Sequence, residues 1–244
     1  MDKIALVVLC YNNWEITKKF IDLIYEHTDM DSFELLFIDN GSTDGSSKNL
    51  NKLEHELDNF HVIINDENKG VICGRNQGFR WFHKDTAFPY LMFLDNDQFV
   101  RDGWLGQHFA VLNKGYDLIG VEAWQMSRQH FPCKKNSSLK EWFSYVGCGG
   151  QLMTRRCVDI VGYYDERYNP CYFEDPDYSY RAFDQGLKIG WNFTAKIDHL
   201  PHQTLGKVGD KRGKFTKSMQ KFQEKWKKRV PPMIYQVDLD EFKD

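Results

Sequence analysis

One short apolar segment, residues 89–100, constrains the fold more than any other part of the sequence. It reads Pro-Tyr-Leu-Met-Phe-Leu-Asp-Asn-Asp-Gln-Phe-Val, so an apolar run ends abruptly in two carboxylates, Asp95 and Asp97. The run is too short for a confident helix and fits a strand that is covered on both faces. Ligands of open α/β sheets bind beyond the carboxyl ends of the strands, so this segment predicts a buried strand that presents a functional site.

The two carboxylates at the end of this strand predict a cation site. If the strand continued, Asp95 and Asp97 would project to the same side. Hard oxygen ligands favour Mg²⁺ or Mn²⁺, which keep open positions for water and for a phosphate-bearing substrate. The alternative is an ordinary turn after a strand, because Asp and Asn are common turn residues.

Other apolar runs alternate with helical patterns. Residues 4–10, 35–38 and 61–64 are predicted strands, and apolar residues at helical spacing between residues 14 and 27 predict a helix. This alternation predicts an α/β fold, with a mainly parallel central sheet flanked by helices. The chain has no Gly-x-Gly-x-x-Gly after the first strand and no Gly-Lys-Ser/Thr phosphate loop, which disfavours NAD enzymes and P-loop NTPases.

Composition and cysteine usage limit the class of protein. The 244 residues contain no Pro/Ser-rich linker or repeat, which favours one domain. The six cysteines form no Cys-x-x-Cys pair, so free thiols and a reducing cytoplasm are expected. Neither a signal peptide nor a spanning helix is expected from the N-terminal sequence. A net charge of −3 gives no global attraction to nucleic acid.

Four more polar motifs occur in a fixed order around the acidic pair. The strand 35–38 ends in Asp39 and a Gly-Ser-Thr-Asp-Gly turn, and the strand 61–64 is followed by Asn-x-Gly and then Arg75-Asn76-x-Gly. Asp-Gly-Trp-Leu follows at residues 102–105, and Glu-Asp-x-Asp-x-x-x-Arg begins at Glu174. In this order the motifs resemble those of the inverting family 2 glycosyltransferases, whose fold is the GT-A type. The resemblance covers roughly residues 4–206.

The resemblance implies a role for each motif. The residues expected to bind the nucleotide-sugar donor are Tyr11, Asp39, Arg75, Asn76, Asp95 and Asn96. The expected metal ligands are Asp95, Asp97 and His199, with His202 as the alternative to His199. The residues expected to bind the acceptor are Trp104, Gly149, Gly150 and Asp177.

The acidic pair Glu174 and Asp175 is expected to be catalytic. A sugar hydroxyl has a very high pKa, so its attack needs a carboxylate that takes the proton, and Asp175 is the predicted base. Glu174 would shape acceptor binding or perturb the pKa of Asp175, while Arg181 can pair with Asp177. The alternative is that these acids only complement a helix N-terminus.

The C-terminal part of the sequence is basic. Residues 1–206 are expected to form the GT-A domain, with a nucleotide-sugar-binding half at 1–100 and an acceptor-binding half at 101–206. Residues 207–244 form a basic helical extension and tail, whose cations at 207–229 serve either as a solvated helix face or as a contact to an anionic acceptor, a membrane or another partner. Residues 123–141 show no period and are predicted to be a loop, either one that shapes the substrate site or an ordinary surface loop.

These features predict an enzyme that transfers a sugar from a nucleoside-diphosphate donor, expected to be a UDP-sugar, to an acceptor hydroxyl with inversion. The acceptor would be a saccharide, a lipid-linked molecule or another hydroxyl compound, and the cofactor Mn²⁺ or Mg²⁺. The expected location is cytoplasmic, with the inner face of a membrane as a peripheral site. The alternatives are a metal-dependent nucleotidyltransferase and a non-catalytic protein that binds carbohydrate or nucleic acid.

Overall fold

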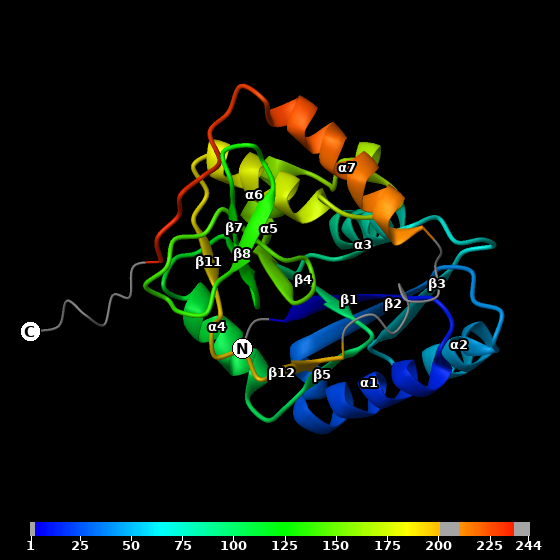
Figure 1. Cartoon of the computed structure of the whole chain (residues 1–244). Coiled ribbons are helices and arrows are strands. Elements are labelled where there is room, and N and C mark those ends of the chain that lie inside the picture. Colours follow the sequence, from blue (N-terminus) through cyan, green and yellow to red (C-terminus); the bar gives the residue numbers. More distant parts are fainter. Residues whose placement is uncertain (1–2, 201–209, 237–244) are drawn as a thin grey trace, which may run out of the picture.

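The centre of the molecule is a seven-stranded sheet (Figure 1). The computed structural model describes residues 3–200 and 210–236. In spatial order the strands are β11 (Ile189–Trp191), β6 (Leu118–Gly120), β10 (Gln151–Thr154), β4 (Tyr90–Asp95), β1 (Ile4–Cys10), β2 (Phe33–Asp39) and β3 (Phe60–Ile64). β10 runs antiparallel to both neighbours, and the other pairings are parallel. The predicted mainly parallel α/β sheet is confirmed.

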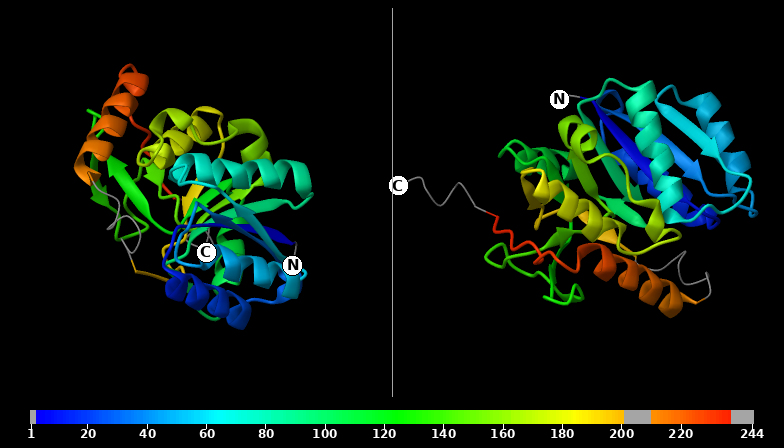
Figure 2. Two further views of the ribbon diagram at one scale, coloured as in Figure 1. Left: turned by 90° about the vertical axis from the view of Figure 1, so that its right-hand side faces the viewer. Right: turned by 90° about the horizontal axis from the view of Figure 1, so that it is seen from above.

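Helices cover both faces of this sheet (Figure 1, Figure 2). One face carries α1 (Trp14–His27), α2 (Ser46–Glu56) and α4 (Trp104–Leu112). The opposite face carries α3 (Val71–Asp85), α5 (Arg155–Val161) and α6 (Glu174–Asp184). Two short 3-10 helices, η1 (Met30–Ser32) and η2 (Glu166–Tyr168), lie in the connections.

The central strand β1 shows why the sequence requires two covered faces. Ile4, Leu6 and Val8 pack with the helices α1, α2 and α4, whereas Ala5 and Val7 pack with the opposite layer. Successive side chains of a strand point to opposite faces, so a continuous apolar run needs cover on both sides. The parallel strands β1, β2 and β4 end at the same edge of the sheet and bring together the polar residues that follow them.

Two small sheets flank that edge. β5 (Gln98–Val100) pairs antiparallel with β12 (Ile197–His199), and β7 (Ala123–Met126) pairs with β8 (Pro132–Lys135) and β9 (Tyr145–Val146). One prediction is corrected here. The region 123–141, predicted to be a loop, contains the β7–β8 hairpin.

The helix α7 (Lys211–Trp226) confirms the predicted C-terminal helix and packs over the α6 side of the sheet (Figure 2). Its Phe222 is fully buried against the rings of Tyr168, Phe173 and Tyr180. Ser218 Oγ donates hydrogen bonds to the backbone carbonyls of Tyr168 and Cys171. Within the described residues, no helix combines the length and the apolar character that crossing a membrane requires.

Candidate active site

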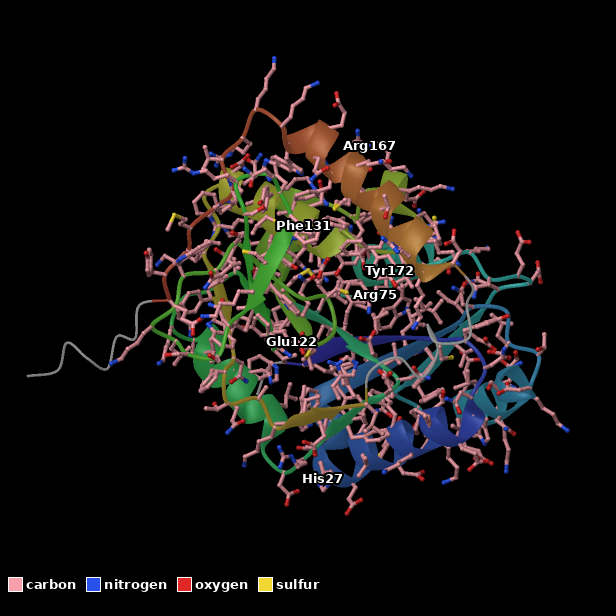
Figure 3. The ribbon with its side chains drawn as sticks, in the orientation of Figure 1. His27, Arg75, Glu122, Phe131, Arg167 and Tyr172 are labelled. Carbon is pink, nitrogen blue, oxygen red and sulfur yellow. The ribbon has the colours of Figure 1, made fainter. Side chains whose placement is uncertain are left out.

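A cavity of about 420 Å³ lies at the carboxyl ends of β1, β2 and β4. Leu9 and Tyr11 line it from the end of β1, Asn40 from the end of β2 and Asp95 from the end of β4. Arg75 also lines it and lies between Glu122 and Tyr172 in the view of Figure 3. Small-molecule sites commonly have about 300–1,000 Å³, so the cavity is large enough for a ligand.

Three predicted metal ligands meet at one end of this cavity. Asp95 ends β4, Asp97 lies in the turn before β5, and His199 ends β12. The pairing of β12 with β5 sets His199 opposite Gln98, so one ligand atom from each of the three residues lies within 4.8 Å of the others. His199 Nε2 is 3.3 Å from Asp97 Oδ1. Two carboxylates and one imidazole are a donor set that fits Mn²⁺ or Mg²⁺, with room for phosphate oxygens. The alternative ligand, His202, lies outside the described residues.

Arg75 is a buried cation in the wall of the cavity. Its Nη2 donates to Asp95 Oδ1, and its Nη1 is 3.9 Å from Glu174 Oε1. Nε and Nη1 of Arg75 and Oε2 of Glu174 are buried and have no hydrogen-bond partner among the residues that the structure describes. Buried polar atoms are nearly always satisfied, so these atoms indicate a place where a ligand completes the hydrogen bonding.

Asp175 faces the cavity from the first turn of α6 and is half-buried. Burial, and next the carboxylate of Glu174, raise the pKa of Asp175 well above its ordinary value. Burial also raises the pKa of Glu174, while Arg75 opposes that rise. A carboxylate with a raised pKa is a stronger base than a solvated one, which suits proton abstraction. Burial likewise keeps Cys148, whose thiol is 3.6 Å from Glu174 Oε1, neutral by raising its pKa.

The predicted residues Tyr11, Asn96 and Gly149 also line the cavity. Asn96 donates to Thr17 Oγ1, which fixes the turn between the two carboxylates. A Cβ built on Gly149 would lie 2.5 Å from Asp95 Oδ2, so only glycine allows this close approach. Gly150 does not line the cavity, and its neighbour is the side chain of Val121, which corrects its predicted acceptor contact.

Two other predicted site residues, Trp104 and Asn76, are buried outside the cavity. Trp104 is fully buried and donates a hydrogen bond through Nε1 to Thr28 Oγ1. It is therefore a core residue of α4 and does not line a site for the acceptor substrate. Asn76 is buried away from the cavity, where its side chain donates to Tyr164 O and accepts from Tyr164 N. Both side chains stabilise the fold and lie outside the cavity.

Asp177 and Asp39 also have their oxygens engaged within the protein. Asp177 is fully buried and pairs with Arg181, as predicted, at 2.9 Å and with Lys225 at 2.6 Å, so it does not face an acceptor. Asp39 is fully buried at the end of β2, where its carboxylate accepts from Ser42 N and from a serine hydroxyl of α2. Asp39 therefore shapes the loop at the cavity edge, and the adjacent Asn40 lines the cavity in its place.

Several cavity residues were not predicted from the sequence. Glu122, Trp124 and Tyr145 line one side, and Tyr172 and Lys214 line the other. The small sheet β8-β7-β9 supplies the first group, and its strands are too short and too polar for periodicity to reveal them. Tyr172 has φ +75°, a left-handed conformation that no sequence pattern indicates for tyrosine.

Comparisons with known proteins define the family. The model of the glycosyl transferase family 2 matches residues 5–161, more than half of the chain. The chain therefore belongs to glycosyl transferase family 2. It is similar to the glycosyltransferase AglE of Haloferax volcanii, with 29% identity over 119 residues that cover 48% of this chain and 38% of that protein. It is also 33% identical to the teichoic acid poly(glycerol phosphate) polymerase of Staphylococcus epidermidis over 98 residues, which cover 40% of this chain and 13% of the polymerase.

Solved structures show the same GT-A type of fold. A structure of GalNAc-T7 with UDP, GalNAc and Mn²⁺ aligns with a TM-score of 0.69 at 15% identity over 81% of this chain and 44% of that one. The mannosyltransferase PcManGT of Pyrobaculum calidifontis, in complex with GDP-Man and Mn²⁺, aligns with a TM-score of 0.62 at 14% identity over 83% of this chain and 58% of that one. The chain thus spans about half the length of these structural neighbours, and well under half of the two curated relatives.

Proposed function

We propose that this chain transfers a sugar from a nucleoside-diphosphate donor to an acceptor hydroxyl. The observation that carries the proposal is one cavity with the Asp95, Asp97 and His199 cluster at one end and the carboxylate of Asp175 facing it from α6. A cation site beside a base is what displacement of a diphosphate by a hydroxyl requires. The expected donor is a UDP-sugar, and a GDP-sugar is the alternative, because the similar structures contain UDP or GDP-Man.

The donor would lie along the carboxyl ends of β1, β2 and β4. Tyr11, Asn40 and Asn68 line this part of the cavity and offer polar groups to the nucleoside. The unpartnered Nε and Nη1 of Arg75 offer a rigid pair of donors to an anionic or carbonyl oxygen. Asp95, Asp97 and His199 would hold Mn²⁺ or Mg²⁺, and the cation when bound would stabilise the charge that develops on the diphosphate leaving group.

Asp175 would act as the general base. The acceptor oxygen attacks the anomeric carbon, its proton moves to the Asp175 carboxylate, and the bond from the anomeric carbon to the phosphate oxygen breaks. The nucleoside diphosphate leaves with that electron pair. One base and no covalent intermediate correspond to a single displacement, which inverts the anomeric centre. Glu174 would position Arg75, and its charge would raise the basicity of Asp175.

Two parts of the prediction rest on the sequence alone. The division into a domain at 1–206 and an extension at 207–244 remains a prediction. An anionic or membrane partner for the basic segment 207–229, and with it a cytoplasmic location at the inner face of a membrane, also remains a prediction.

Donor binding tests the proposal. UDP-, GDP-, dTDP- and CMP-sugars are added with and without Mn²⁺, and the melting temperature is measured. A ligand that binds only the folded chain stabilises it by about 2.7 kcal/mol at a concentration of 100 times its Kd. This stabilisation raises the melting temperature. We expect a Mn²⁺-dependent shift with one nucleotide class, and we expect Asp97→Ala to lose it because one cation ligand is removed.

The matched control is Asp66→Ala, because Asp66 is exposed and lies outside the cavity. This variant should keep the full shift. The product then separates the proposal from its rival, since a glycosyltransferase releases a nucleoside diphosphate and a nucleotidyltransferase releases pyrophosphate. Release of pyrophosphate, or the absence of a shift with every donor, would contradict the proposal.

A further inference from the structure

The wall of the cavity formed by the small sheet β8-β7-β9 has no role in donor chemistry. Glu122, Trp124, Pro132 and Tyr145 line it. We propose that this wall is the acceptor subsite and that the acceptor is a neutral saccharide unit, with its ring face on Trp124 and its hydroxyls on Glu122 and Tyr145. This inference rests on the proposed function and names the substrate class of the same site.

Trp124 supplies a flat apolar surface. It lies in β7 opposite Tyr145 of β9 and Lys135 of β8, so pairing on both sides holds its backbone. Its side chain is half-buried and lines the cavity, and Lys135 Nζ lies 5.9 Å from the ring centroid. An indole held in this way can cover the C–H face of a pyranose ring, which removes apolar surface from water without a large entropy cost.

Glu122 supplies a hydrogen-bond acceptor beside that ring. Its Oε1 accepts from Lys135 Nζ at 2.5 Å, which fixes the carboxylate, and the side chain remains 30% exposed. The bond to Lys135 engages Oε1, and the side chain of Glu122 also lines the cavity. A carboxylate oriented by a cation on one oxygen can accept from a sugar hydroxyl on the other.

Tyr145 supplies a complementary donor. The residue is buried, and it lines the cavity. Burial, and next the charge of Asp175, raise the pKa of Tyr145, so the hydroxyl keeps its proton. The charges of Glu122 and Asp175 also act on each other. A sugar hydroxyl placed on this wall therefore lies near the proposed base.

The charge of this wall selects among acceptors. The acidic groups nearest this wall are Glu122, Glu174 and Asp175, and the cation Lys135 is already paired with Glu122. Arg75, 3.9 Å from Glu174, offsets part of this charge, and Lys214 lines the cavity as well. A phosphate or carboxylate on the acceptor would therefore meet an excess of negative charge beside Glu122 and Asp175. A neutral sugar has no such cost, and its vicinal hydroxyls match a carboxylate acceptor and a phenol donor.

Acceptor kinetics test this inference. The donor that gives the largest thermal shift is combined with methyl glycosides of glucose, galactose, mannose and N-acetylglucosamine, with glycerol, and with glycerol 3-phosphate. Nucleoside-diphosphate release and product mass are measured. We expect transfer to at least one neutral glycoside and little to the other compounds. Trp124→Ala should raise the acceptor KM at least tenfold with donor affinity retained, and Trp124→Phe should recover part of that loss.

The matched control is Trp142→Ala, because Trp142 is also half-buried but lies outside the cavity. It should keep the acceptor KM of the wild type. Glu122→Gln and Tyr145→Phe should reduce discrimination against deoxy glycosides, which purely structural roles would not do. Exclusive use of glycerol or glycerol 3-phosphate, an unchanged KM in Trp124→Ala, or no transfer to and no binding of any glycoside would each overturn the inference. If no donor binds, the proposed function itself fails, and the two failures are thus distinct.

Discussion

Asp175 combines reactivity with a cost in stability. Its carboxylate lies beside Glu174, and the charges of Arg75 and Glu122 also act on it. Its pKa is raised in the folded chain, so the folded state holds the proton more tightly than the unfolded state does. Stability therefore falls as pH rises from the ordinary carboxyl range through the folded-state pKa. Ionised Asp175 is thus a reactive but destabilising group, a combination that is common where a site is built for chemistry.

We predict that Asp175→Asn loses transfer and gains stability. An amide cannot take the acceptor proton, so kcat should fall by about 10²–10⁴-fold. The melting temperature above neutral pH should rise, because like-charge repulsion with Glu174 is removed. Transfer rates and melting curves between pH 5 and 9 measure both effects, with the exposed Asp58→Asn as control. Wild-type transfer should increase with pH over this range, and full activity of Asp175→Asn would refute the assignment.

The helices α6 and α7 are joined by a buried charge network. Asp177 of α6 is fully buried and accepts from Arg181, from Trp226 Nε1 at 2.9 Å and from Tyr168. Lys225 Nζ contacts Asp177 at 2.6 Å and also the carboxylate of Asp165, the residue that precedes η2. α6 begins with the proposed base, so this network holds the catalytic end of α6 against the C-terminal helix.

We predict that Lys225→Met destabilises the chain by about 2 kcal/mol, because it leaves the buried Asp177 with less compensating charge. The estimate lies below the cost of fully breaking a buried pair, since Asp177 keeps Arg181 and Trp226 as partners. Urea unfolding should show a lower midpoint at an unchanged slope. Lys227→Met is the matched control, because Lys227 is exposed and pairs with the likewise exposed Glu224 of the same helical segment. Equal midpoints for the two variants would contradict the role of the network.

The sequence predicted elements better than side-chain directions. The strands β1, β2 and β4 were predictable because continuous apolar runs ending in Asp or Asn have few other solutions in an α/β chain. The direction of Trp104 was not, since an aromatic residue after an acidic turn fits a cleft or a core equally well. Asp177 likewise belongs to an acidic motif, but two of its partners, Lys225 and Trp226, lie about 50 residues later and carry no local signal.

At the scale of the whole molecule, the C-terminal helix α7 packs against the same core as the sheet. The family match ends at residue 161, but the core on the α6 face continues through Trp191 and Phe222 to Ile234. Both core layers share the same central sheet, so loss of one layer exposes the strands that support the other. The sequence placed a boundary near residue 206 because charge changes there, and charge does not report packing.

We predict that Phe222→Ala lowers the stability of the whole chain and not of a separate extension. Removing a fully buried Phe costs about 3–5 kcal/mol. For a chain of this size that corresponds to a melting temperature about 6–20 °C lower. Calorimetry should show one transition for wild type and variant, with equal calorimetric and van't Hoff enthalpies, because the helix and the sheet unfold together. Phe131→Ala is the control, since that ring is 48% exposed, and it should melt within about 2 °C of wild type. A second transition, or a variant that keeps the wild-type melting temperature, would instead make residues 207–244 an independent extension.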